Sequence, residues 1–85
     1  MSPEKLTRMA NEIGKFFRHR PEPRAIADTA DHIKKYWDPR MRREIVAHLE
    51  AGGAGLDPIV RRAVSDIAAD LKDHHIHPVA LEGEE

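Results

Sequence analysis

The sequence predicts an all-α protein, a compact array of about four short helices. Apolar residues recur at helical spacing in four segments, and no stretch alternates apolar and polar residues long enough to be a strand. Each segment begins near a proline that follows an oxygen-bearing side chain, in Ser2–Pro3, Glu22–Pro23, Asp38–Pro39 and Asp57–Pro58. Serine and aspartate cap the first backbone N–H groups well, glutamate does so poorly, and proline suits the following position because its missing N–H would have no partner.

The apolar spacing places the helices at roughly residues 3–19, 23–37, 39–51 and 58–72. The glycine-rich segment 51–56 ends the third helix, because glycine readily adopts the left-handed conformation of a helix C-terminus. The second and third helices meet at Trp37-Asp38-Pro39 without a spacer, so the chain bends there. The expected inward faces hold Leu6, Met9, Ala10, Ile13 and Phe17 (with Phe16 at the edge), then Ile26, Ala30, Ile33 and Trp37, then Met41, Ile45 and Leu49, and finally Val60, Val64, Ile67 and Leu71.

The chain has 85 residues, which is room for one small core. We expect a single helical domain over residues 1–72 and a flexible, disordered tail over 73–85, because the tail is acidic and lacks apolar periodicity. Gly14 lies inside the first helix, where glycine costs about 1 kcal/mol relative to alanine. It is either a tolerated surface residue or a point of close approach by another helix or a partner.

Composition excludes several function classes. Lys plus Arg is 14 and Asp plus Glu is 15, a net charge of −1 that argues against a protein dedicated to coating nucleic acid. The absence of cysteine excludes disulfides and thiolate ligation of iron–sulfur clusters. The longest apolar runs have only three residues, as in 79–81, and are too short to span a membrane, and the charged opening segment favours a cytoplasmic location.

No arrangement of residues predicts a catalytic, cofactor-binding or metal site. Three of the six histidines, His74, His75 and His77, lie in the expected tail, and the others are on separate helices, so zinc would lack scaffolded ligands. Segment 52–55 lacks the Gly-Lys-Ser/Thr of a phosphate loop, and neither serine has a histidine at helical spacing. We therefore expect a chain that performs no chemistry of its own.

The start of the third helix breaks a local electrostatic rule. Arg40, Arg42 and Arg43 crowd its first turns, where the helix dipole disfavours cations. Beside Tyr36 and Trp37, they have the composition of an interface hot spot. A solvated basic face around a buried tryptophan explains the same residues, and their chemistry alone slightly favours this second interpretation.

Three stretches resemble a known family. The run HIKKYWDPRMR (residues 32–42) is similar to the signature of the delta subunit of cytoplasmic, NAD-dependent, molybdenum-containing formate dehydrogenases. MANEIGKFF (9–17) resembles the N-terminal helix of that family, and GGAGLDPIVRRA (52–63) resembles its glycine turn and last helix. The three follow the family's order within residues 6–71, and the Trp-Asp-Pro-Arg-Met-Arg string is the most specific part.

The resemblance implies an accessory subunit. In this family the large alpha subunit holds molybdopterin and oxidises formate, whereas beta and gamma subunits carry flavin and iron–sulfur centres and reduce NAD. The delta subunit lies outside the active centre and supports quaternary structure. We therefore expect a non-catalytic chain without cofactor that binds the alpha subunit. The predicted partner-binding residues are Tyr36, Trp37, Asp38, Arg40, Arg42 and Arg43.

Two alternatives stay open. The chain could be an assembly or maturation factor that assists cofactor loading of the same enzyme without remaining bound. It could also be a small helical nucleic-acid binder that uses five basic residues of its third and fourth helices, although the net charge of −1 argues against this. The five residues are Arg40, Arg42, Arg43, Arg61 and Arg62.

Overall fold

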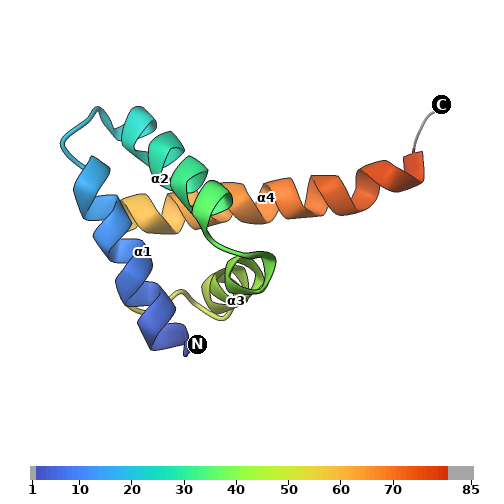
Figure 1. The fold of residues 1–85 in the computed structure, drawn as a ribbon, viewed down its shortest axis with the longest axis horizontal. Helices are drawn as coiled ribbons and strands as arrows, with labels where there is room; N and C mark the ends of the chain where they lie inside the picture. The colour runs from blue at the N-terminus through green and yellow to red at the C-terminus, as the bar shows by residue number, and fades with distance from the viewer. Residues whose placement is uncertain (1, 81–85) are drawn as a thin grey trace.

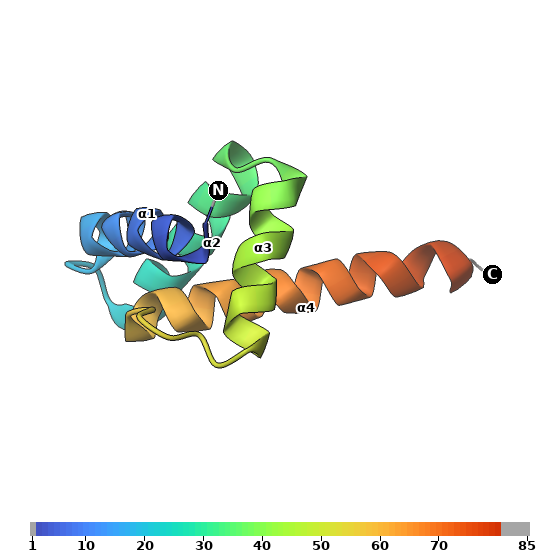
Figure 2. The same cartoon turned by 90° about the horizontal axis from the view of Figure 1, so that it is seen from below.

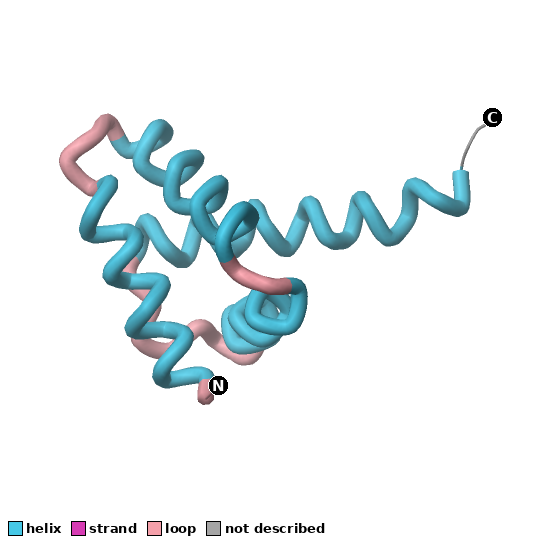
Figure 3. Tube along the Cα trace, viewed as in Figure 1, coloured by secondary structure: helices cyan, strands magenta, loops and turns pink. Residues whose placement is uncertain are grey.

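The computed structural model describes the backbone of residues 2–80 and the side chains of residues 2–71. Within these residues the chain forms four helices and no strand, which confirms the predicted all-α class (Figure 1). Their connections are short (Figure 3). The helices are α1 (Pro3–Phe17), α2 (Glu22–Tyr36), α3 (Pro39–Glu50) and α4 (Pro58–Ala80).

The predicted caps determine where α1 and α3 begin. The Ser2 hydroxyl accepts a hydrogen bond from the backbone N–H of Lys5 at 3.2 Å, and the Asp38 carboxylate accepts one from that of Met41 at 2.9 Å. By contrast, α2 has no side-chain cap and begins at Glu22, one residue before the predicted start. Both caps precede a proline that occupies the first helical position, as the sequence predicts.

The four helices enclose one hydrophobic core. α1 and α2 form a splayed hairpin, α4 passes across both of them, and α3 crosses α4 (Figures 1 and 2). The predicted inward faces of α2 and α4 are confirmed, and Val46 and Leu56 join the core in addition. The buried apolar residues are Leu6, Ala10, Ala25, Ile26, Ala30, Ile33, Trp37, Ile45, Val46, Leu56, Val60, Ala63, Val64 and Ile67.

Gly14 is a helix-crossing residue and not a tolerated surface glycine. It is buried, and a Cβ atom at this position would lie 2.5 Å from Cγ2 of Val60 on α4. Real Cβ atoms do not approach other carbon atoms so closely, and Val60 is itself fully buried. The glycine therefore allows α1 and α4 to pack against each other directly.

The inward face of α1 ends earlier than its apolar spacing predicts. Phe17 is only half-buried, and Phe16 is 71% exposed. Leu6 and Ala10 are fully buried, so the core covers the N-terminal part of the predicted stripe. Instead of entering the core, Phe17 packs against the rings of Phe16 and His32 at the surface between α1 and α2.

α4 continues past its predicted end. We expected it to stop near residue 72, but its backbone remains helical through Ala80 and projects beyond the other helices (Figure 1). The sequence has no glycine between Gly55 and Gly83 to end the helix, and the helix-breaking Pro78 comes only in the last turn of α4. The predicted tail at 73–85 therefore overlaps a helix over 73–80, and residues 81–85 lie outside the described residues.

Candidate partner-binding site

Trp37 anchors the bend between α2 and α3 in the core. Its side chain is 5% exposed, and its backbone N–H donates a hydrogen bond to the carbonyl of Ile33 at 3.0 Å. The residue itself is extended, with φ −89° and ψ 140°, so the chain leaves α2 and enters α3 within two residues. A partner protein could not reach this indole, so Trp37 supports the bend from inside.

Asp38, a second predicted partner residue, is the N-cap of α3. Its carboxylate accepts the capping hydrogen bond from Met41, and its carbonyl accepts one from the backbone N–H of Arg42 at 3.1 Å. The first bond satisfies the backbone N–H of Met41, which otherwise has no partner in the helix, and the second is the first i→i−4 bond of α3. Asp38 therefore shapes the bend.

Arg42 has an intramolecular role that explains its position. Its half-buried side chain extends back to α2, where Nη1 donates hydrogen bonds to the carbonyls of Lys34, at 3.0 Å, and Trp37. Carbonyls at a helix C-terminus lack intrahelical partners and carry the negative end of the dipole. A cation that is unfavourable at the start of α3 is thus favourable at the end of α2.

The other three predicted residues are exposed at the bend. Tyr36 is 72% exposed, and the side chains of Arg40 and Arg43 also face solvent. Arg40 and Arg43 are three positions apart, so they share one face of α3. Among the residues that the structure describes, neither guanidinium takes part in an ion pair. We call Tyr36, Arg40 and Arg43 the basic corner.

Arg61 resembles Arg42 in its contacts. Its Nη2 donates hydrogen bonds to the carbonyls of Gly52 at 3.0 Å and Gly53 at 2.9 Å, in the turn that ends α3. Gly53 has a φ of +64°, a conformation that favours glycine. Two of the five arginines proposed for nucleic-acid binding, Arg42 and Arg61, therefore already donate hydrogen bonds to backbone carbonyls of this chain.

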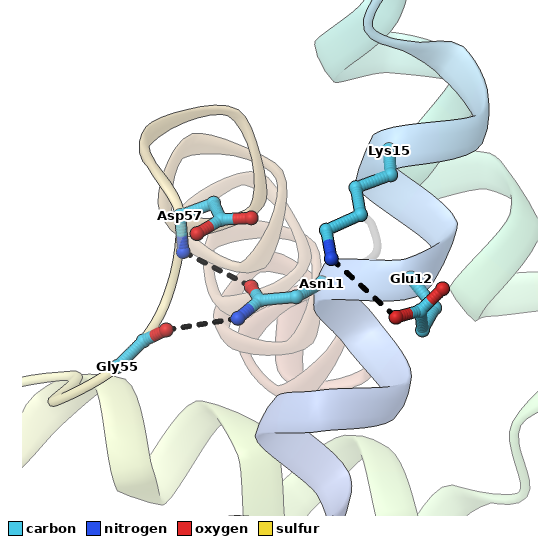
Figure 4. A network of polar contacts seen from close by, with 5 residues as sticks. All are labelled: Asn11, Glu12, Lys15, Gly55 and Asp57. Atoms are coloured by element: carbon cyan, nitrogen blue, oxygen red, sulfur yellow. Dashed lines mark hydrogen bonds and ion pairs between the residues drawn. The ribbon is translucent and has the colours of Figure 1, made fainter.

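The loop between α3 and α4 is also attached to α1 (Figure 4). The side-chain amide of Asn11 donates to the carbonyl of Gly55 at 2.9 Å, and its oxygen accepts from the backbone N–H of Asp57 at 3.0 Å. The ring of His48 lies 2.8 Å from the carbonyl oxygen of Ala54. These contacts fix the start of α4 and give His48 a structural position at the edge of the core.

The structure also contains an aromatic surface that the sequence analysis missed. Phe16 and Phe17 of α1 pack edge to face, Phe17 packs on His32 of α2, and His32 packs on Tyr36. We call these four residues the aromatic strip. Helical spacing assigns Phe17 to the core. The one sequence signal for an exposed ring is the position of Phe16 at the edge of the apolar face of α1.

The described side chains contain no cluster of three potential metal ligands. The side chains of His74, His75 and His77 lie outside the described residues. Within the described part of the chain, every helix is too short or too polar to cross a membrane.

The fold and its surfaces define a small helical protein that presents exposed cationic and aromatic groups, a composition typical of protein–protein interfaces. Comparison with protein families identifies it more closely. Residues 5–64 match the family described as NADH-dependent formate dehydrogenase delta subunit FdsD, and the chain belongs to that family. The resemblance noted in the sequence is thereby confirmed. Searches of curated proteins and of solved structures gave no match.

Proposed function

We propose that this delta subunit is a non-catalytic component that binds the large alpha subunit of formate dehydrogenase and stabilises its quaternary structure. A delta subunit has other formate dehydrogenase subunits as its partners. The observation that carries the proposal is the basic corner, where Arg40 and Arg43 project from one face of α3 beside an exposed tyrosine. Arginine pairs well with carboxylates at interfaces, so the complementary surface on the alpha subunit is acidic.

The proposal assigns no cofactor to this chain. Iron–sulfur clusters require thiolate ligands in almost all proteins, and the sequence has no cysteine. The sequence also has no phosphate-binding loop for a nucleotide cofactor. The purified chain should therefore lack iron–sulfur, flavin and molybdenum absorption, and a stoichiometric cofactor in it would contradict the proposal. The family resemblance supports a cytoplasmic location for the complex.

The test is co-purification of the full chain with a tagged alpha subunit in the presence of the remaining subunits. The variant Arg40→Glu/Arg43→Glu should weaken association by about tenfold or more at physiological salt, because it sets carboxylates against an acidic surface. The matched control is Arg24→Glu/Arg62→Glu, which makes the same charge change at exposed residues near the starts of α2 and α4. The control should bind normally.

Two results would overturn the proposal. Normal binding of the folded Arg40→Glu/Arg43→Glu variant would mean that the basic corner is only a solvated face. Absence of the chain from the mature enzyme, together with failure of cofactor loading when it is deleted, would establish the assembly role instead.

A further inference from the structure

The aromatic strip carries an inference beyond the basic corner. Its end members, Phe16 and Tyr36, are the large apolar side chains that remain exposed in the described residues, at 71% and 72%. A continuous series of ring contacts joins them, with centroid separations of 5.1 Å from Phe16 to Phe17, 6.2 Å to His32 and 4.7 Å to Tyr36. These separations are typical of interacting aromatic pairs. The four rings therefore form one surface and not scattered exposed residues.

A shallow groove of about 280 Å³ lies beside the strip and is lined by residues of α1 and α2. Ile13 adds an aliphatic side chain to the aromatic rings that line this groove. Adjoining apolar groups of this kind, rimmed by polar residues, mark contact sites on soluble proteins. The lining residues are Glu12, Ile13, Phe16, Phe17 and His32.

The charges around the strip indicate the chemistry of its occupant. The carboxylates near the rings are already paired, Asp28 with Arg20 and Asp31 with Lys35. The Arg20 guanidinium, 5.2 Å from the centroid of the Phe17 ring, is likewise paired, whereas Arg40 and Arg43, which follow Tyr36 after the bend, have no ion pair among the described residues. Apolar side chains along the rings, with carboxylates beyond Tyr36 that reach Arg40 and Arg43, would complement this surface.

We propose that the aromatic strip binds an acidic amphipathic helix of a larger formate dehydrogenase subunit. The inference rests on the proposed function, because it takes the partner to be a subunit of that complex. Aromatic and arginine side chains are the usual anchors of such contacts. Tyr36 belongs to both the strip and the basic corner, so one helix could cover the rings and direct its carboxylates to Arg40 and Arg43.

A second copy of this chain fits the strip less well. The carboxylates that a second copy would bring near its strip, Glu12, Asp28 and Asp31, are already paired within that copy, so Arg40 and Arg43 would gain no acidic partner. The area is also small, because two half-covered rings and two largely exposed ones offer much less than the roughly 800 Å² per partner of a stable interface. The strip needs a neighbouring surface, and the basic corner provides it.

The test measures binding of the full chain to a formate dehydrogenase preparation that lacks it. The variant Phe16→Ala/Tyr36→Ala should raise the dissociation constant by about tenfold or more. Its circular dichroism spectrum and melting should match those of the wild type, since both side chains are largely exposed. The matched variant Phe16→Leu/Tyr36→Phe retains apolar area and should bind nearly as well as the wild type. Equal binding by the alanine variant would overturn the proposal.

The occupant can be identified by a photocrosslinking amino acid in place of Phe16. In the purified complex, the crosslinked peptide should come from a larger subunit and combine apolar residues at helical spacing with aspartate or glutamate. A crosslink to a second copy of this chain, or to a segment without carboxylates, would overturn the proposal.

The two proposals can fail separately. If the Arg40→Glu/Arg43→Glu variant loses binding but the alanine variant of the strip does not, the strip proposal fails and the basic corner stands. If the strip variant alone loses binding, the aromatic rings are the contact and the two arginines of the corner are not. Normal binding by both folded variants would reject both surfaces.

Discussion

The two turns that flank α3 are each held by an arginine from the following helix. At the bend, Arg42 of α3 donates to the carbonyls of Lys34 and Trp37 at the end of α2. At the glycine loop, Arg61 of α4 donates to the carbonyls of Gly52 and Gly53 after α3. At the bend, this guanidinium alone among the described side chains donates hydrogen bonds back to the end of α2, whereas the loop also has the side-chain contacts of Asn11 and His48.

This difference shows how a misplaced charge should be interpreted. A cation near the start of one helix is unfavourable there, but it can stabilise the end of the helix before it when the chain turns sharply. Arg42 and Arg61 are both of this kind, so their positions say nothing about a partner. The residues at the bend that are available to a partner are Arg40 and Arg43, whose side chains are exposed to solvent.

The largest expected effect on stability compares the buried side chains under the two turns. Trp37→Ala should lower the free energy of unfolding by about 3–5 kcal/mol, because it removes a buried ring that the small core cannot replace. Leu56→Ala, under the glycine loop, should cost about 2–3 kcal/mol. Urea titration followed by circular dichroism measures both. A smaller loss for Trp37→Ala than for Leu56→Ala would reverse the comparison.

Arg42→Ala should have the next largest effect. It leaves two carbonyls at the end of α2 without their cationic donor, and we expect a loss of about 1.5–3 kcal/mol. Arg42→Lys keeps the charge but not the planar fork, so its loss should be intermediate. If Arg42→Ala unfolds at the same urea concentration as the wild type, the bend does not depend on this contact.

The glycine loop should tolerate the same change better. Arg61→Ala should cost about 0.5–1.5 kcal/mol, because the side chain is exposed and Asn11 still holds the loop. Asn11→Ala should cost about 1 kcal/mol for the same reason. The double variant should lose more free energy of unfolding than the two single variants together, because neither side chain is then left to hold the loop. Additive losses would show that the two contacts act independently.

The smallest effect on stability is expected at the basic corner. Arg40→Glu/Arg43→Glu should change the free energy of unfolding by no more than about 0.5 kcal/mol, with a slight gain because acidic side chains suit the first turns of α3. Thermal unfolding of the isolated full chain is the measurement. A loss above about 1 kcal/mol would mean that these arginines are structural and that the corner is not free to bind.

The sequence predicted most of the fold because its signals are local. Ser2, Asp38 and their following prolines mark helix starts, and the apolar residues of α2 and α4 identify their buried faces. Apolar spacing does not reveal which part of a stripe another helix covers, so Phe17 was assigned to the core. The continuation of α4 through Ala80 was missed because a lack of apolar periodicity was interpreted as the end of the helix.

The candidate site could be predicted only in part, for a related reason. The Trp37-Asp38-Pro39 string predicted the bend itself, but the role of each side chain there depends on where distant atoms lie. The carbonyls that Arg42 contacts belong to the preceding helix, and no sequence pattern indicates that the two helices place them within its reach. The predicted set of six therefore divides into three residues that build the bend and three that remain exposed.

The close crossing of α1 and α4 has a consequence for the evolution of the family. Because Gly14 leaves no room for a Cβ atom beside Val60, the two positions share one fixed volume. Relatives that carry alanine at the first position should carry alanine or glycine at the second, so that the helices keep their separation. We therefore expect these two positions to co-vary among delta subunits, although they lie on the first and last helices of the chain.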